Sequence, residues 1–427
     1  MLAIFLLAAM PGLIPIPAAA AQQTVSIYCD GESSDEVLMT ALVAAFQKAN
    51  PSFKVNFTVA PKGVDTKEAV RVRLAAGKMA DVFSFYSGSL FQKLAPAQNL
   101  VDLGNEPWSS RVISSFNPAV SVGPVIYGAP LGYAMGGGIL YNKLVYSRLK
   151  LHIPHTWKQF MTNNALIKKA GIIPVVQTYG DDWTAQLLVL ADAYNLMAAF
   201  PGFPDLYTSN RVRIAETPAA LAGFRHLAEV YGTNSLNKDF RTATFGTGLK
   251  YLATGRAAHY PMLSFASTQL AEDFPKLAEN IGMFAEPGIS AKSNGLTIWL
   301  PNALYIPKST SHLFAAKKFV AFAMSAPGRS VMSNAMPPTG PYMIKNAKLT
   351  GKISTITRDM FRYFNSPGKT VPALEFLTPV KGPALPKITV QVGSGILTAE
   401  EGAVAYDKDV KAESAALGLP GWGKLPG

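Results

Sequence analysis

Cysteine is nearly absent from this chain, since Cys29 is the single one among 427 residues. An intrachain disulfide is therefore impossible, and a zinc site built from several cysteines is excluded. The five histidines are scattered, without the H-E-x-x-H spacing of zinc proteases or a similar pattern. We therefore expect no bound metal and no cofactor.

Charge is also scarce, because charged residues make up 15% of the chain and hydrophobic residues 49%. This composition is typical of a folded globular protein with a sizeable core. The length allows one large domain or two to three ordinary ones. The net charge of +12 is spread along the chain without a nucleic-acid-binding motif, so we do not expect nucleic acid as a partner.

The first 21 residues lack charge altogether and contain an apolar run, Leu2–Met10. Prolines interrupt this run well short of the roughly 20 residues that a membrane span needs. Small residues follow at Ala18–Ala21, which favours a cleaved secretory signal peptide over residues 1–21 rather than an anchor. We therefore expect export to the periplasm or to the outer face of the cell membrane.

Alternating apolar residues predict strands at Thr24–Cys29 and Phe53–Val59, with a third at Asp81–Phe85. Helical patterns separate them; Ser33 with Glu36 predicts a capping box for the first, and Asp65 is the predicted N-cap of the second. A β-α-β-α-β order indicates an α/β fold with an open, mostly parallel sheet. Such sheets bind ligands beyond the carboxyl ends of their strands.

A second α/β region is predicted from about Met135 to Asn280. It contains a predicted buried strand at Ile172–Val176 and a predicted helix at Thr184–Met197, which follows the loop Gly180–Trp183.

Short motifs occur in a characteristic order along the chain. They are L-A-A-G-K-M-A-D-V at Leu74–Val82, Y-G-A-P-L-G-Y at Tyr127–Tyr133, Y-N-K at Tyr141–Lys143 and P-H-T-W-K-Q-F at Pro154–Phe160. This series resembles the extracellular solute-binding proteins of ABC importers, in their carbohydrate-binding branch, the maltose-binding-protein-like family. Ala80 stands where that family usually has proline.

The resemblance implies a two-lobe periplasmic-binding-protein fold with a hinge and a ligand cleft between the lobes. It divides the chain into residues 22–131 and 284–336 for lobe 1 and residues 132–283 and 337–427 for lobe 2. The expected chain crossings lie near Leu131–Ala134, Phe284–Pro287 and Pro337–Gly340. It also implies a monomer that captures a small solute, a sugar or oligosaccharide, and delivers it to a membrane-embedded ABC permease.

Sugars stack their C–H faces on aromatic rings and need planar polar groups for their hydroxyls. Aromatic and polar residues at predicted strand ends and cleft loops are therefore the candidate ligand-binding residues: Asp30, Glu32, Phe85, Tyr86, Ser87, Tyr133, Asp181, Trp183, Phe265 and Trp299. Each aromatic residue has an alternative as an ordinary core residue, notably Phe85 within a strand and Trp299 between the lobes.

Catalysis is not expected. Asp30 and Glu32 share one loop instead of facing each other as glycosidase carboxylates do, and Ser87 lacks the G-x-S-x-G surroundings of a nucleophile. Two alternatives stay open at this point: a binding protein for an anionic solute or ferric iron, and a secreted carbohydrate-active enzyme. The net charge favours anions, whereas the absence of a Tyr-Tyr pair disfavours iron.

Overall fold

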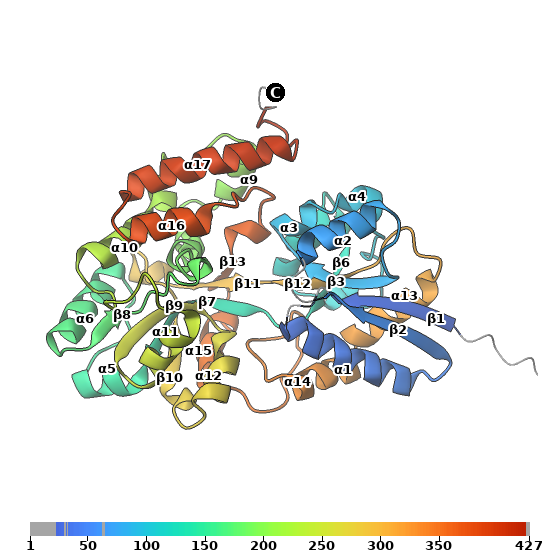
Figure 1. The fold of residues 1–427 in the computed structure, drawn as a ribbon, viewed down its shortest axis with the longest axis horizontal. Helices are drawn as coiled ribbons and strands as arrows, with labels where there is room; N and C mark the ends of the chain where they lie inside the picture. Colours follow the sequence, from blue (N-terminus) through green and yellow to red (C-terminus); the bar gives the residue numbers. More distant parts are fainter. Residues whose placement is uncertain (1–22, 30, 32, 62–64, 424–427) are drawn as a thin grey trace, which may run out of the picture.

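The computed structural model describes residues 23–29, 31, 33–61 and 65–423, so the predicted signal peptide, Asp30 and Glu32 lie outside the described residues. The chain forms two α/β lobes that lie side by side along the long axis of the molecule (Figure 1). This confirms the predicted two-lobe α/β fold class. Within the described ranges, no helix combines the length and the apolar character needed to cross a bilayer.

The first lobe is built on a mixed sheet. In spatial order its strands are β2 (Phe53–Val59), β1 (Gln23–Cys29), β3 (Val82–Tyr86), β12 (Asn302–Tyr305) and β6 (Gly128–Leu131). β1 runs parallel to β2 and β3, whereas β12 is antiparallel to β3 and β6. The β-α-β-α-β opening is thus confirmed, and it places Tyr86 at the edge where open α/β sheets bind ligands.

Helices pack around this sheet: α1 (Ser33–Ala49), α2 (Thr66–Ala75), α3 (Ser89–Gln92), α4 (Pro96–Asn99), α13 (Leu313–Met324) and α14 (Ala326–Ala335). A small antiparallel pair, β4 (Ser121–Val122) and β5 (Val125–Ile126), belongs to the same lobe. The predicted cap of α2 is confirmed, because Asp65 Oδ1 accepts hydrogen bonds from the backbone N–H groups of Lys67 and Glu68. The side chain of Ser33 lies outside the described part of the chain.

The second lobe has its own sheet. Its strands in spatial order are β13 (Thr370–Pro372), β11 (Leu296–Trp299), β7 (Met135–Asn142), β9 (Ala257–Leu263) and β8 (Ile173–Val175), and β10 (Ile281–Phe284) also pairs with β7. Adjacent residues of β7 belong to different buried hydrophobic clusters, Ile139 to one and Leu140 to the other. The sheet is therefore buried on both faces, as parallel and mixed sheets of α/β proteins are.

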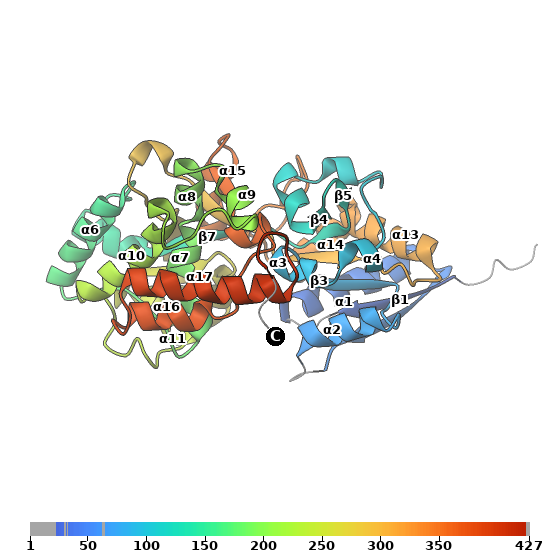
Figure 2. The same cartoon turned by 90° about the horizontal axis from the view of Figure 1, so that it is seen from above.

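The helices of this lobe are α5 (Lys143–Leu149), α6 (Trp157–Lys169), α7 (Leu187–Ala191), α8 (Ala193–Ala199), α9 (Phe203–Thr208), α10 (Pro218–Gly232), α11 (Phe245–Ala253), α12 (Ala266–Asp273), α15 (Thr355–Phe364), α16 (Leu385–Gly393) and α17 (Ala399–Ala416). Figure 2 shows α17 reaching toward α3 of the first lobe, and there Lys93 forms an ion pair with Glu413.

The prediction of one helix over Thr184–Met197 was wrong. The structure has two helices there, α7 and α8, which are separated at Asp192. The cause is Thr297 on β11. Its hydroxyl donates a hydrogen bond to Ala191 O at 2.5 Å and accepts one from Tyr194 N at 2.9 Å. A side chain of a neighbouring strand thus takes over backbone groups that a continuous helix would pair internally.

Each strand belongs to the sheet of one lobe, and this assignment shows where the chain passes from one lobe to the other. The first passage lies between Leu131 and Met135, in the predicted region. The second lies between Trp299 and Asn302 instead of near Phe284–Pro287, because β11 still pairs with β7. The reason is that β10 covers only Ile139–Asn142 of β7, which leaves the beginning of this strand free to bind β11.

The last passage between the lobes lies beyond the predicted crossing at Pro337–Gly340. After Pro337–Gly340 the chain returns to the first lobe, where Ile344 forms an antiparallel bridge with Val112. It then enters α15, which packs against β10 in the second lobe.

Candidate functional site

The two lobes face each other across a cavity of about 750 Å³, a size within the range of small-molecule sites. Its walls come from α1 and the ends of β3 and β12 in the first lobe, and from α11, β9 and α12 in the second. The lining residues used below are Asp35, Tyr86, Gly132, Tyr133, Phe245, Phe265, Thr268, Gln269, Glu272, Trp299 and Asn302.

One wall carries a cluster of three aromatic rings. Trp183 lies 5.6 Å from Phe245 and 6.0 Å from Phe265 between ring centroids, and the two phenylalanines are 5.7 Å apart. All three side chains are half-buried. Phe245 and Phe265 line the cavity, and Trp183 packs behind them. The two phenylalanines therefore present apolar ring surface to the cavity while they remain packed against Trp183.

Asp181 holds this cluster in place. Its Oδ2 accepts a hydrogen bond of 2.6 Å from the backbone N–H of Phe245, at the beginning of α11. The carboxylate lies at the N-terminus of a helix, where negative charge is stabilising. It thereby ties the loop that carries Trp183 to the helix that carries Phe245.

Polar groups from α12 continue the same wall. Phe265, at the beginning of this helix, Thr268, Gln269 and Glu272 all line the cavity. Their spacing of three, four and seven positions after Phe265 puts them on one helical face. An amide, a hydroxyl and a carboxylate therefore stand next to the aromatic rings, which is the combination that a sugar requires.

The opposite wall belongs to the first lobe. Tyr86 is half-buried at the end of β3, and the Lys67 ammonium lies 5.3 Å from the centroid of its ring. Asn302 Nδ2 donates a hydrogen bond of 2.8 Å to Asp35 Oδ1, and both side chains are buried. This pair fixes the orientation of two planar polar groups beside the cavity.

The floor is formed by the link between β6 and β7. Gly132 has a φ of +76°, a conformation that L side chains rarely adopt. Tyr133 beside it is buried, and its hydroxyl donates to Ser333 Oγ at 3.2 Å. Burial raises the pKa of Tyr133 far above its usual value, so the phenol stays neutral and serves as a fixed hydrogen-bond donor.

Trp299 lines the cavity at the second passage, but most of its ring is engaged by the protein. It is 6% exposed, and its Nε1–H donates a hydrogen bond of 3.1 Å to Glu375 Oε1. A Cβ added at Gly137 would lie 1.9 Å from Cζ3 of the ring. Gly137 thus leaves the space that Trp299 occupies.

The ten candidate ligand-binding residues divide into groups. Tyr86, Tyr133, Phe265 and Trp299 line the cavity, and Trp183 and Asp181 support its aromatic wall. Phe85 and Ser87 are buried in the first lobe, where the hydroxyl of Ser87 donates to Leu300 O. Asp30 and Glu32 lie outside the described residues.

Sequence reasoning missed several lining residues: Asp35, Phe245, Thr268, Gln269, Glu272 and Asn302. For α12 a signal was available, because polar residues recur at helical spacing after Phe265. Asp35 and Asn302 are 267 positions apart, so only the pairing of β12 with β3 brings them together.

The cavity wall carries an electrostatic bias. Its acidic lining residues in the described part of the chain are Asp35 and Glu272, and it includes no lysine or arginine there. The net charge of +12 is therefore not concentrated at the cavity wall.

Comparisons with known proteins agree with this geometry. Residues 31–329 match the family described as bacterial extracellular solute-binding protein. A multiple sugar-binding protein of Streptococcus mutans is 25% identical over 310 residues, which cover 70% of this chain and 70% of that protein.

Solved structures share the fold. A chitin oligosaccharide binding protein superposes with a TM-score of 0.75 at 18% identity, covering 92% of this chain and 98% of that one. RafE in complex with raffinose gives a TM-score of 0.71 at 22% identity, covering 93% and 98%. These relatives are binding proteins and not enzymes. The family match covers more than half of this chain, which therefore belongs to the bacterial extracellular solute-binding protein family.

Proposed function

We propose that this protein captures a neutral sugar or oligosaccharide in the cavity between its lobes, outside the cytoplasm. The loaded protein, a monomer, then delivers the sugar to a membrane-embedded ABC permease. Tyr86, Phe245 and Phe265 form the aromatic part of the binding site, Trp183 supports the two phenylalanine rings from behind, and Gln269, Glu272 and Asn302 bind hydroxyl groups.

The observation that carries this proposal is the composition of the cavity wall. Half-buried aromatic rings lie beside amide, hydroxyl and carboxylate groups on one face of α12 and its neighbours. Rings bind the C–H faces of a sugar, and the planar polar groups bind its hydroxyls. The names of the sugar-binding relatives support the same class of ligand.

An anionic solute fits this wall poorly. Asp35 and Glu272 would repel it, and no lysine or arginine in the described part of the wall offers compensation. Lys67, whose ammonium lies over the Tyr86 ring, is exposed and does not belong to the described lining of the cavity. We therefore prefer a neutral ligand, although the net charge of the chain favours anions.

A thermal-shift screen tests the ligand class. Raffinose, stachyose, chitin oligosaccharides, xylo-oligosaccharides and galactose form one panel, and sugar phosphates form another. A ligand at 100 times its Kd stabilises the folded state by about 2.7 kcal/mol. We expect a neutral sugar to raise the melting temperature of the mature protein, without hydrolysis of that sugar. A response to phosphates alone would contradict the proposal, and turnover of a glycoside abolished by Glu272→Gln would make the protein an enzyme.

A further inference from the structure

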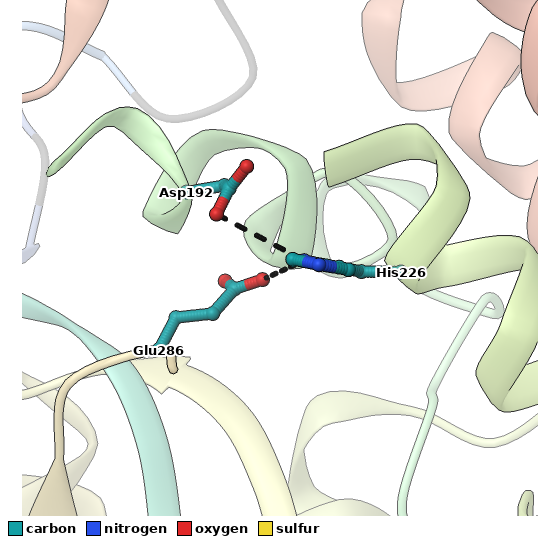
Figure 3. A group of neighbouring side chains, drawn as sticks. All are labelled: Asp192, His226 and Glu286. Carbon is teal, nitrogen blue, oxygen red and sulfur yellow. Dashed lines mark hydrogen bonds and ion pairs between the residues drawn. The ribbon is translucent and has the colours of Figure 1, made fainter. Parts of the chain in front are cut away.

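A second cluster of polar side chains lies inside the second lobe, away from the cavity. It consists of Asp192 between α7 and α8, His226 on α10 and Glu286 just after β10 (Figure 3). These side chains are almost fully buried, with exposed fractions of 3%, 7% and 1%. The ligand atom that each residue offers lies within 4.8 Å of the other two.

The cluster has more acceptors than donors. His226 Nδ1 lies 3.1 Å from Glu286 Oε1 and 3.8 Å from Asp192 Oδ1. One ring nitrogen carries at most one hydrogen, so it cannot donate to both carboxyl groups. Glu286 Oε2 is buried and has no hydrogen-bond partner among the described residues. No described lysine or arginine forms an ion pair with either carboxyl group.

The surroundings hold the three groups in place. Trp157 stacks on the His226 ring, with centroids 3.8 Å apart and an interplanar angle of 14°. Asn195 Nδ2 donates to Asp192 Oδ1 at 2.7 Å and to Glu286 O at 3.2 Å. Stacking and outer hydrogen bonds of this kind orient the ligands of protein metal sites.

We propose that Asp192, His226 and Glu286 bind a divalent transition-metal ion, with zinc as the best match. With Nε2 protonated, His226 presents the Nδ1 lone pair toward the same point as the two carboxylates. Bonds of about 2.0–2.2 Å in a tetrahedral site place ligand atoms about 3.3–3.6 Å apart. The distances of 3.1 and 3.8 Å from His226 Nδ1 to the two carboxylates differ from this range by only a few tenths of an ångström, and all three ligand atoms lie within 4.8 Å of one another.

The ion replaces a positive charge that the protein does not supply. Two ionised carboxylates in the interior cost free energy unless a cation or protons compensate them. A cavity of about 50 Å³ borders Asp192, which is room for a water molecule. The ion would join three separate segments of the second lobe, so its role is structural.

Zinc titration of untagged, EDTA-treated mature protein tests the site. We expect one zinc ion per chain by calorimetry and elemental analysis, and a rise in melting temperature that EDTA reverses. Glu286→Gln preserves the shape of the side chain, and His226→Asn preserves a donor toward Glu286. Because each removes a ligand, both should weaken zinc binding by more than the roughly 10–100-fold typical of an outer-shell change.

His312→Gln is the matched control. His312 Nδ1 lies 3.3 Å from a carboxylate oxygen of Asp81, but its side chain is 46% exposed. It is thus the place where zinc would bind adventitiously, and its loss should leave the stoichiometry unchanged. The proposal is overturned if no zinc binds at 100 µM, which would mean that protons alone compensate the carboxylates. It is also overturned if Glu286→Gln binds zinc as tightly as the wild type does.

Discussion

Trp299 lines the interlobe cavity and Trp183 lies behind the rings that line it, and the surroundings of the two tryptophans differ. Trp299 is 6% exposed, donates a hydrogen bond to Glu375 and fits against Gly137. Trp183 is half-buried and packs against Phe245 and Phe265, which face the cavity. The comparison shows that an aromatic ring near a cleft can serve either the stability of the fold or the binding of a ligand. Residual exposure and engagement of the polar atom distinguish the two.

The same division applies to the tyrosines. The Tyr133 hydroxyl donates to Ser333 and its ring is buried, so this residue stabilises the link between the lobes. Tyr86 remains half-buried at the edge of the first sheet, where its ring faces the cavity. Substitutions in these pairs should therefore separate stability from affinity.

The largest effect is expected for Trp299→Ala. Removing a buried tryptophan typically lowers the free energy of unfolding by about 3–5 kcal/mol, and here it also removes a hydrogen bond to Glu375. Chemical denaturation measures the loss. Trp183→Ala should lose less than half as much, because its ring is already partly exposed. Equal losses for the two variants would abolish the distinction.

An intermediate effect is expected for Trp183→Ala on binding. The affinity for the sugar identified by thermal shift should fall by roughly 1–3 kcal/mol, the range for losing a well-packed aromatic contact. Trp183→Phe is the control, because it keeps a ring against Phe245 and Phe265 and should retain most of the affinity. Calorimetric titration gives both values. Unchanged affinity together with a large loss of stability would make Trp183 a core residue.

The smallest effect is expected for Tyr133→Phe. The variant loses only the hydroxyl, which donates to Ser333 Oγ and to Met336 O, so the free energy of unfolding should fall by about 0.5–1.5 kcal/mol. Sugar affinity should stay within error, since the hydroxyl points to the protein. Paired denaturation and titration experiments check this result. A tenfold loss of affinity would move Tyr133 into the binding site.

Local patterns predicted much of the fold. The strands β1, β2 and β3 and the N-cap Asp65 all concern residues close in sequence, and the structure confirms them. The capping box that begins α6, formed by Thr156 and Gln159 three positions apart, is a signal of the same local kind. Such signals are reliable because backbone propensity and capping act within one or two turns.

Non-local contacts decided the rest. The division of α7 from α8 depends on Thr297, and the second chain passage depends on the pairing of β11 with β7. Likewise, Asp192, His226 and Glu286 come from separate elements, so no spacing motif could predict a metal site. The absence of such motifs excludes local metal sites but not those that tertiary structure assembles.

Small-angle scattering tests the central claim, that a sugar binds between two lobes and holds them together. A ligand that contacts both walls must favour the closed state, and motion should occur at the links because packed cores resist deformation. We predict that the radius of gyration falls when the sugar found by thermal shift saturates the protein, and that Trp183→Ala needs a higher sugar concentration for the same fall. Superimposable curves for the free and saturated wild-type protein would contradict the account.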